Sequence, residues 1–453
     1  MFRSVNPVNN ELINEFPILS KGEIRFVLKS AEHEYANWRE LSVEDRISLI
    51  KLFSNTLEAQ SDELAKIITL EMGKPFKQSV AEVKKSVLLC DYYCANALKS
   101  LSPKIKSLPS KVIQYIPEPY GVLIGIMPWN FPVWQCLRFA IPALINGNCI
   151  LLKPAPNTSL SVLFVENLIS KTTGTNIFKT ILVRNNDIKR IIADKSIRGV
   201  SFTGSAQTGG IIASMAGKNI KKTVLELGGS DPFIVFEDAD LEKAVDKLII
   251  SRFNNTGQTC IAAKRILLQK SIKKPFLDML LSKVENLKMG DPFDKDVVIS
   301  TLARNDIKEN LQSQLDKSID LGANPLLSGG SVKGDGHYFK PVILTNIKKG
   351  MPVYSEEVFG PIITIIPFSD VKHAIEIAND TQYGLGASVW TNSLKIEQLM
   401  YNFLECGYVS INDYVRSEPS VPFGGVKNSG YGKELGETGL LEFAHFKSVV
   451  KSL

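Results

Sequence analysis

From residue 121 onward, short apolar runs rich in β-branched residues alternate with longer stretches of helical periodicity. One series of runs lies at residues 122–126, 149–152, 180–183, 199–202 and 223–227, and a second at residues 233–236, 265–268, 362–366, 387–390 and 408–411. Such alternation is typical of parallel strands joined by crossover helices, which bury both faces of a sheet. The sequence therefore predicts an α/β fold with two doubly wound domains.

The first hundred residues carry helical patterns with capping signals, so helices precede the first core strand. We assign residues 1–110 and 120–227 to the first domain and residues 228–431 to the second. The short β-prone segments 111–119 and 432–453 lie outside both predicted sheets. They form either a small separate β arm or ordinary edge strands.

The composition argues against several classes of protein. A chain of 453 residues has room for about three folded units. With 44% hydrophobic and 22% charged residues, it is close to ordered globular proteins. The net charge of +6 comes from 53 basic and 47 acidic residues that are spread along the chain. Nucleic-acid binding is therefore not expected.

Neither export nor membrane insertion is expected. The N-terminus lacks the apolar core of a secretory signal, and three prolines interrupt the apolar segment 122–152. The six cysteines lack the spacing of a disulfide framework, which favours reduced thiols in the cytoplasm. Cys90 and Cys94 have a helical spacing but no further ligands nearby, so no metal site is expected.

Three polar motifs, each close to an apolar run, contain the candidate catalytic residues. They place Asn130 in Met-Pro-Trp-Asn-Phe-Pro, Glu226 in Leu-Glu-Leu-Gly-Gly and Cys260 in Asn-Thr-Gly-Gln-Thr-Cys. Cys260 follows small and polar residues rather than packing residues, as expected for a nucleophile. Together the three side chains can supply a nucleophile, an oxyanion donor and a base. A cysteine hydrolase is the alternative, but it needs an imidazole, and none of the four histidines lies in a motif with Cys260.

In this order and at these separations, the motifs resemble those of the aldehyde dehydrogenase superfamily, and the resemblance covers nearly the whole chain. It implies that Cys260 attacks an aldehyde and that Asn130 stabilises the oxyanion of the thiohemiacetal. It also implies that Glu226 activates the water that hydrolyses the thioester. Relatives that transfer the acyl group to coenzyme A usually lack this glutamate, so the expected product is a free acid.

The resemblance also bears on assembly. In this family, segments such as 111–119 and 432–453 pair across subunits, so a homodimer or homotetramer is expected. A catalytically silent binding or structural protein with the same fold is the alternative. The presence of all three candidate catalytic side chains argues against it.

A dinucleotide site is predicted where the run at 199–202 gives way to a helix. There the backbone N–H groups of Thr203, Gly204, Ser205 and Gly209 can meet a pyrophosphate at the helix N-terminus. The resemblance adds eight further residues to the expected cofactor site: Met127, Pro128, Trp129, Lys153, Pro156, Leu227, Glu357 and Phe359. Residues 172–186 lack the glycine-rich loop usual in the family, which leaves the cofactor contacts of that segment open.

Pro156 bears on the choice of cofactor. Many NAD-selective relatives carry a glutamate at this position, three residues after Lys153, where it binds the ribose hydroxyls. The absence of that carboxylate removes a repulsion against a 2′-phosphate. The expected cofactor is therefore NADP or NAD, with NADP accepted.

The expected substrate follows from Arg138, which lies on an otherwise apolar helix four residues after Trp134. A guanidinium among such neighbours requires an anionic or polar partner. Together with Ser417, these residues resemble bacterial succinate-semialdehyde dehydrogenases, in which arginine and serine hold the distal carboxylate. Succinate semialdehyde is thus the expected substrate, and another short aldehyde such as glutarate semialdehyde is the alternative. Arg138 can instead pair with a protein carboxylate, and Glu437 either matches a late acidic position of some relatives or lies on the surface.

Overall fold

The first series of apolar runs forms a six-stranded sheet in the computed structural model, which describes residues 1–453. Its strands, in spatial order, are β21 (Gly430–Tyr431), β9 (Lys222–Glu226), β8 (Ile197–Thr203), β5 (Val122–Ile126), β6 (Cys149–Lys153) and β7 (Phe178–Thr180). All are parallel except β21, which pairs antiparallel with β9. The run predicted at 180–183 lies too late, because β7 ends at Thr180.

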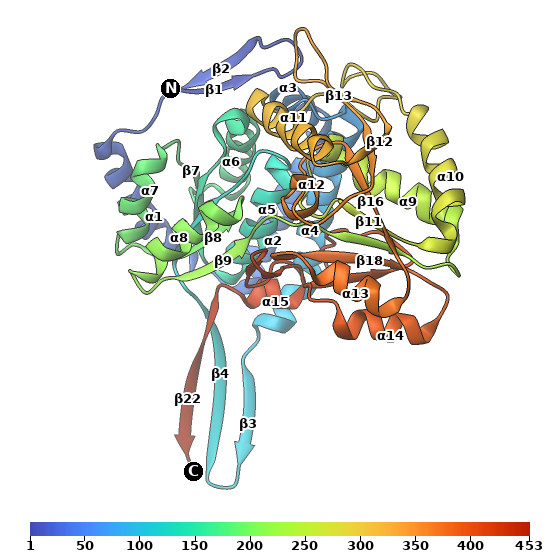
Figure 1. Ribbon diagram of the computed structural model, residues 1–453. Helices are drawn as coiled ribbons and strands as arrows, with labels where there is room; N and C mark the ends of the chain where they lie inside the picture. The colour runs from blue at the N-terminus through green and yellow to red at the C-terminus, as the bar shows by residue number, and fades with distance from the viewer.

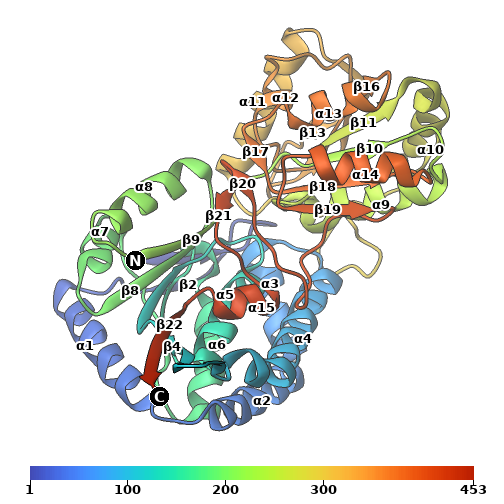
Figure 2. The ribbon, with the colours of Figure 1, turned by 90° about the horizontal axis from the view of Figure 1, so that it is seen from below.

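Helices cover both faces of this sheet (Figure 2). On one side lie α1 (Lys21–Trp38), α7 (Asn185–Ala193) and α8 (Ala206–Gly217). On the other lie α2 (Val43–Ala59), α3 (Ser61–Met72), α4 (Phe76–Leu101), α5 (Pro132–Asn146) and α6 (Ser159–Thr173). Every residue of α5 is buried, because this helix packs between the sheet and the long helix α4.

The second series belongs to a seven-stranded sheet. Its order is β12 (Asn324–Leu327), β15 (Val342–Thr345), β16 (Ile362–Phe368), β11 (Arg265–Gln269), β10 (Pro232–Val235), β18 (Gly386–Trp390) and β19 (Tyr408–Ile411). Only the edge strand β12 is antiparallel to its neighbour. The sequence pattern did not predict β12 or β15, which lie at one edge of the sheet.

Two hydrophobic cores flank the second sheet. In β16, Ile362 and Ile366 enter one core, whereas Ile363 and Ile365 enter the other, as expected when successive side chains point to opposite faces. One core contains residues of α9 (Leu241–Phe253) and α10 (Lys273–Glu285). The other contains residues of α11 (Asn305–Asp320), α12 (Pro352–Ser355), α13 (Val371–Asn379) and α14 (Leu394–Phe403). The domain is thus doubly wound.

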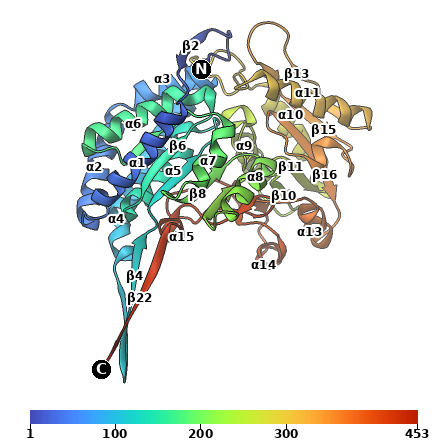
Figure 3. The ribbon, with the colours of Figure 1, turned by 90° about the vertical axis from the view of Figure 1, so that its left-hand side faces the viewer.

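A three-stranded antiparallel sheet extends away from both domains (Figure 1, Figure 3). It consists of β3 (Lys104–Leu108), β4 (Lys111–Pro119) and β22 (Ala444–Ser452). Two predicted boundaries therefore need correction. β3 belongs to this arm although residues 1–110 were assigned to the first domain, because it forms a tight hairpin with β4. The segment 432–453 is divided, because α15 (Gly436–Leu441) packs against α4 and α5 and only β22 joins the arm.

The remaining strands form small two-stranded sheets. These are β1 (Phe2–Val5) with β2 (Leu12–Phe16), β13 (Gly330–Ser331) with β14 (Phe339–Lys340), and β17 (Tyr383–Gly384) with β20 (Val426–Lys427). Because β20 pairs within the second domain and β21 with the first sheet, the chain around residue 428 links the two domains (Figure 2). None of the helices combines the length and the apolar character required to span a bilayer.

Candidate active site

A cavity of about 660 Å³ lies between the two domains. Helices α4 and α5 of the first domain form one wall. The loop that contains Cys260 and the segment 414–420 form the other. Cavities of this size between domains are common small-molecule sites. No group of three or more His, Cys, Asp or Glu side chains is placed to hold a metal ion.

The loop before Cys260 is held in an unusual backbone conformation. Asn255, Thr256 and Gly257 all have positive φ angles, of 56°, 55° and 80°. Hydrogen bonds hold this turn: the Asn255 N–H donates to Gln78 Oε1 at 2.7 Å, and the Ser300 N–H donates to Thr256 Oγ1 at 3.0 Å. Strained backbone of this kind persists only where its surroundings hold it, and it is typical of functional sites.

Cys260 follows this turn and lines the cavity, with its side chain half-buried. Burial raises the pKa of its thiol to about 12, although the positive charges of Lys264 and Arg138 oppose the shift. The thiol is therefore neutral at pH 7 in this state. A nucleophilic thiolate requires a base or a further positive charge close to the sulfur atom.

Asn130 lies in the turn between β5 and α5 and contacts the cysteine loop from the first domain. Its Nδ2 donates to the backbone oxygen of Gln258 at 3.1 Å, and its own backbone oxygen accepts from Asn255 Nδ2 at 2.9 Å. Asn130 is therefore fixed to the loop two residues before Cys260. The structure brings together two motifs that are 130 residues apart in the sequence, from Asn130 to Cys260.

Glu226 is the last residue of β9 and is only 3% exposed. Its Oε1 has no hydrogen-bond partner, and burial raises the pKa of the carboxyl group to about 8. The negative charge of Glu226 also contributes to the raised pKa of the Cys260 thiol. Glu226 thus has the properties of a proton acceptor for chemistry near neutral pH, and it acts in the same electrostatic environment as Cys260.

Arg138 lines the cavity but already has a protein partner. Its Nε forms an ion pair with Glu434, and the two side chains are only 2% and 4% exposed. The alternative in which Arg138 pairs with a protein carboxylate is therefore realised. The sequence pointed to Glu437 as a late acidic residue, but Glu437 is exposed and Glu434 is the buried one. In the sequence, only the flanking glycines Gly432 and Gly436, which have positive φ angles in the structure, distinguish Glu434 from an ordinary surface glutamate.

Trp134 and Ser417, the other two predicted substrate residues, line the same cavity, although they come from segments far apart in the chain. Between them lies a residue that the sequence analysis missed. Lys85 of α4 donates from Nζ to Ser417 Oγ at 2.8 Å, and its Nζ is 4.0 Å from the centroid of the Trp134 ring. A cation, a hydroxyl group and an aromatic ring therefore lie side by side where the two walls of the cavity meet.

The predicted cofactor residues of the first domain gather along one edge of its sheet. The parallel strands β5, β6, β8 and β9 all end there, and each is followed directly by a predicted residue or motif. In chain order these are Met127, Pro128 and Trp129 after β5, Pro156 shortly after β6, Gly204 and Ser205 after β8, and Leu227 after β9. In open α/β sheets, the carboxyl edge is the usual ligand site.

The turn from β8 to α8 is shaped by close contacts. The Gly204 N–H donates to the backbone oxygen of Glu226 at 3.0 Å. Ser205 caps α8, because its Oγ accepts from the Thr208 N–H at 3.3 Å. A Cβ atom at Gly209 would lie 2.5 Å from Leu227 Cδ2, so glycine lets α8 approach this strand end without displacing the Leu227 side chain. The N-terminus of α8 is therefore open at the sheet edge, where a phosphate can bind.

Lys153 ends β6 at the same edge, and its surroundings show whether this site suits an anionic cofactor. The side chain is 6% exposed and forms no ion pair, and its Nζ makes one long hydrogen bond of 3.4 Å to the Pro154 oxygen. Thr203 Oγ1, also buried, has no partner. A buried lysine with a single long hydrogen bond and a buried hydroxyl group without a partner fit a ligand that carries hydroxyl and phosphate oxygens. The exposed Pro156 adds no carboxylate beside them.

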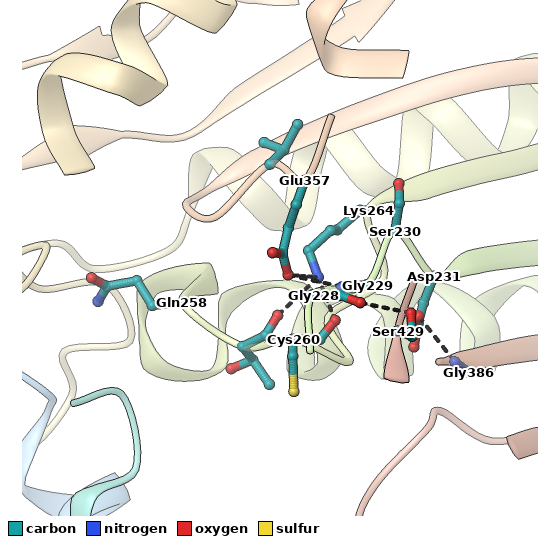
Figure 4. A network of polar contacts seen from close by, with 12 residues as sticks. Gly228, Gly229, Ser230, Asp231, Gln258, Cys260, Lys264, Glu357, Gly386 and Ser429 are labelled. Carbon is teal, nitrogen blue, oxygen red and sulfur yellow. Dashed lines mark hydrogen bonds and ion pairs between the residues drawn. The ribbon is translucent and has the colours of Figure 1, made fainter. Parts of the chain in front are cut away.

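Glu357 lies close to Gly229 and Lys264, beside the loop of Cys260 (Figure 4). Its Oε1 accepts from the Gly229 N–H at 3.1 Å and lies 3.5 Å from Lys264 Nζ. Lys264, which the sequence analysis also missed, donates from Nζ to the Thr259 oxygen at 3.0 Å and also to the Cys260 oxygen. In Figure 4 the Cys260 sulfur atom points away from this network. The network fixes the Cys260 backbone and leaves the sulfur atom free.

Phe359 completes this side of the site. Its ring packs edge-on against Trp129, with 5.8 Å between the ring centroids. The two predicted cofactor residues from different domains are therefore in contact.

Comparisons with known proteins agree with this geometry. The aldehyde dehydrogenase family model matches residues 1–449. The chain is 39% identical to the NAD(P)+ succinate semialdehyde dehydrogenase of Escherichia coli (strain K12), over 99% of this chain and 97% of the relative. It is 38% identical to a probable NADP+ succinate-semialdehyde dehydrogenase of Synechocystis, over 98% of each chain.

Solved structures agree as well. Succinic semialdehyde dehydrogenase from Streptococcus pyogenes, in complex with NADP+, has a TM-score of 0.96 at 32% identity, over 99% of each chain. Betaine aldehyde dehydrogenase from Staphylococcus aureus, in complex with NAD+, has a TM-score of 0.94 at 30% identity, over 99% of this chain and 91% of that one. The protein therefore belongs to the aldehyde dehydrogenase family.

Proposed function

We propose that this protein oxidises succinate semialdehyde to succinate, with NADP or NAD as the hydride acceptor. The observation that carries this proposal is the cavity itself, in which Cys260 lies in one wall and the basic residues Lys85 and Arg138 lie in the other. A short aldehyde with a distal carboxylate matches both features. The similarity to the succinate semialdehyde dehydrogenases of Escherichia coli and Synechocystis supports the same substrate.

The reaction begins when the Cys260 thiol gives up its proton to solvent water and the resulting thiolate adds to the aldehyde carbon, which gives a thiohemiacetal with a negative oxygen. The side-chain amide of Asn130 has a second N–H that can donate to this oxygen, and a backbone N–H of the loop can do the same. Because Asn130 is held to the loop by two hydrogen bonds, it needs little reorganisation during the reaction. Loss of a hydride from the same carbon leaves a thioester on Cys260, and a bound nicotinamide cofactor would supply the acceptor for that hydride.

Hydrolysis of the thioester requires water and a base. The Glu226 carboxylate takes a proton from water, the resulting hydroxide adds to the acyl carbon, and the sulfur leaves as thiolate. The products are a carboxylic acid and free Cys260. The buried position of Glu226 and its pKa of about 8 suit this role.

The cofactor would be held by residues of both domains. Lys153 and the turn at 203–205 would bind its ribose and phosphate groups, and Glu357 would bind the nicotinamide ribose. Pro156 places no carboxylate near the adenosine ribose, which supports acceptance of NADP. The relatives from Escherichia coli and Synechocystis carry NAD(P)+ and NADP+ in their names, which supports the same choice.

We also propose that the arm joins subunits into a homodimer or homotetramer. Apolar side chains on its strands are exposed, namely Ile105, Tyr115, Phe446, Val449 and Val450. Such a surface is favourable only when it is covered. The six cysteines are all free, which supports a reducing, cytoplasmic compartment.

The test is a steady-state assay of the purified protein with succinate semialdehyde, glutarate semialdehyde and butanal, each with NADP and with NAD. The appearance of the reduced cofactor is followed. We expect the highest kcat/KM for succinate semialdehyde, with activity on NADP. A higher kcat/KM for butanal, or no reduced cofactor with any of the three aldehydes, would rule out the proposed substrate.

A further inference from the structure

Lys85 lies on the face of α4 that borders the cavity. Gln78, Ala81, Glu82, Leu88 and Tyr92 line the cavity from the same helix, at spacings of three or four residues from one another or from Lys85. The preceding residue, Lys84, points to solvent and is exposed. The helical periodicity therefore directs one of two adjacent lysines into the cavity.

Of the three cations that line the cavity, Lys85 alone has no carboxylate partner. Arg138 pairs with Glu434, and Arg416 pairs with both Asp413 and Glu418. No ion pair is formed by Lys85. Lys85 is therefore the one cavity cation that no protein carboxylate contacts directly.

The nearest carboxylate on the same helix is already occupied. Glu82 forms an ion pair with Lys74, and its Oε1 accepts from the Val133 and Trp134 N–H groups at 2.9 and 3.0 Å. Glu82 therefore serves to fix the start of α5. Its interactions leave Lys85 without a local counterion.

The Lys85 ammonium group is nevertheless held in a defined position. It donates to Ser417 Oγ at 2.8 Å and lies over the Trp134 ring at 4.0 Å. Because Ser417 Oγ accepts this bond, its own hydroxyl hydrogen is free to donate. An ammonium group and a hydroxyl donor side by side match the two oxygens of a carboxylate.

We propose that Lys85, together with Ser417, binds the distal carboxylate of the substrate, and that Arg138 is a structural residue of the wall held by Glu434. This inference rests on the proposed function and assigns its specificity to a residue that the sequence did not single out. A substrate carboxylate would supply the missing counterion of Lys85 and would replace water around a half-buried cation.

The charge of Lys85 gives the proposal a pH signature. Burial, and then the charge of Arg138, lower the pKa of Lys85 to about 7, whereas Glu82, Glu418 and Cys260 oppose the shift. The ammonium form must be present to bind a carboxylate. As the pH rises above about 7, the KM for succinate semialdehyde should therefore rise, whereas the KM for butanal should not follow it.

The direct test replaces Lys85 with methionine, which keeps the length of the side chain and removes the charge. We expect the KM for succinate semialdehyde to increase roughly tenfold or more relative to the KM for butanal, each normalised to the wild type. Lys85→Arg should recover part of the loss. The matched control is Lys84→Met, one residue away on the exposed side of the helix, for which both KM values should stay within about twofold.

A binding measurement separates recognition from catalysis. Succinate should raise the thermal unfolding temperature of the wild-type protein more than butyrate does, and Lys85→Met should abolish that difference. If the methionine variant fails to fold, Lys85→Gln replaces it in both experiments. An unchanged KM for succinate semialdehyde in the variant, or an equal loss for both aldehydes, would overturn the role of Lys85.

The substrate preference of the wild-type protein distinguishes failure of this inference from failure of the proposed function. If the wild type does not favour succinate semialdehyde over butanal, the proposed function fails, and the role of Lys85 fails with it. If the wild type shows that preference and Arg138→Met removes it while Lys85→Met does not, only the assignment to Lys85 is wrong.

Discussion

Two walls of the same cavity are built in different ways. Around Cys260, backbone geometry holds the site. The loop contains three consecutive residues with positive φ angles, and a buried asparagine and a buried lysine donate hydrogen bonds to its main-chain oxygens. Around Lys85, side chains hold the site, through one hydrogen bond to Ser417 and one contact with the Trp134 ring. The first wall is adapted to chemistry that all aldehydes share. The second can change its preference through one side chain.

This difference teaches which substitutions should affect every substrate. Changes near Cys260 should lower activity on succinate semialdehyde and on butanal alike, because both use the same reacting atoms. Changes near Lys85 should separate the two substrates. Each of the following substitutions therefore concerns the surroundings of Cys260 and is measured with both aldehydes. They are given from the largest expected effect to the smallest.

Cys260→Ala should have the largest effect. Loss of the nucleophile should lower kcat with either aldehyde by about 10³-fold or more, because no covalent intermediate can form. The control is Cys94→Ala, which removes a half-buried thiol of helix α4 and should retain activity. Substantial turnover by the Cys260 variant would show that another group attacks the aldehyde.

Glu226→Gln should lower kcat by about 10²-fold, because the thioester then lacks a base for hydrolysis. Hydride transfer precedes this step, so rapid mixing should reveal a burst of reduced cofactor close to one equivalent per active site. In the wild type, burial raises the pKa of Glu226 to about 8. Its proton-accepting form therefore increases as the pH rises, and kcat should rise up to about pH 8 and then level off.

Two results would contradict this role of Glu226. One is a Glu226→Gln variant with no burst and a slow first turnover, which would place the residue before hydride transfer. The other is a kcat that falls between pH 6 and 8 in the wild type. Both are measured with butanal as well, because the step does not depend on the substrate carboxylate.

Gly257→Ala tests the backbone geometry of the loop before Cys260. An added Cβ would lie 2.7 Å from the backbone carbonyl carbon and oxygen of Gly360, at a residue with a φ angle of 80°. We expect a loss of ~2 kcal/mol in the free energy of unfolding, measured with denaturant. Activity should fall equally for both aldehydes, because the loop carries Cys260. Gly210→Ala, where nothing lies within 4 Å of the added atom, is the control. A selective loss with succinate semialdehyde would break the distinction between the two walls.

Glu434→Gln should have the smallest effect, a change of a few fold in kcat near neutral pH. The charge of Glu434 raises the pKa of Glu226, whereas that of Arg138 lowers it. Neutralising Glu434 should therefore move the inflection of the kcat profile to lower pH. The pH dependence of kcat for butanal measures this shift. An inflection that stays in place or moves upward would show that Glu434 does not act on Glu226.

The fold was largely predictable, because its signal is local and repeated. Buried parallel strands are continuous apolar runs, and nearly all such runs form strands in the structure. Two of the strands that were missed, β12 and β21, are short edge strands, whereas the missed strand β15 is buried between β12 and β16. β3 was also missed, since its Lys-rich sequence has no buried face and is defined by its hairpin with β4.

The candidate site was predictable only in part, because its residues differ in how much local sequence reveals. Cys260 and Asn130 lie in turns, and Glu226 ends an apolar strand just before two glycines, so the sequence itself departs from packing patterns at all three. Lys85 lies next to Lys84 on an amphipathic helix and has the sequence appearance of a surface residue. Only the packing of α4 against α5 turns one of the two lysines toward the cavity.

The sequence by itself determined the α/β class, the two domains and the three motifs that carry the chemistry, because those features depend on residue type and short-range periodicity. The tertiary structure alone decided the partners of the charged groups. It pairs Arg138 with Glu434 and leaves Lys85 without a carboxylate. The physical reason is that charges interact through space over a few ångströms, so their pairing depends on segments that are far apart in the chain.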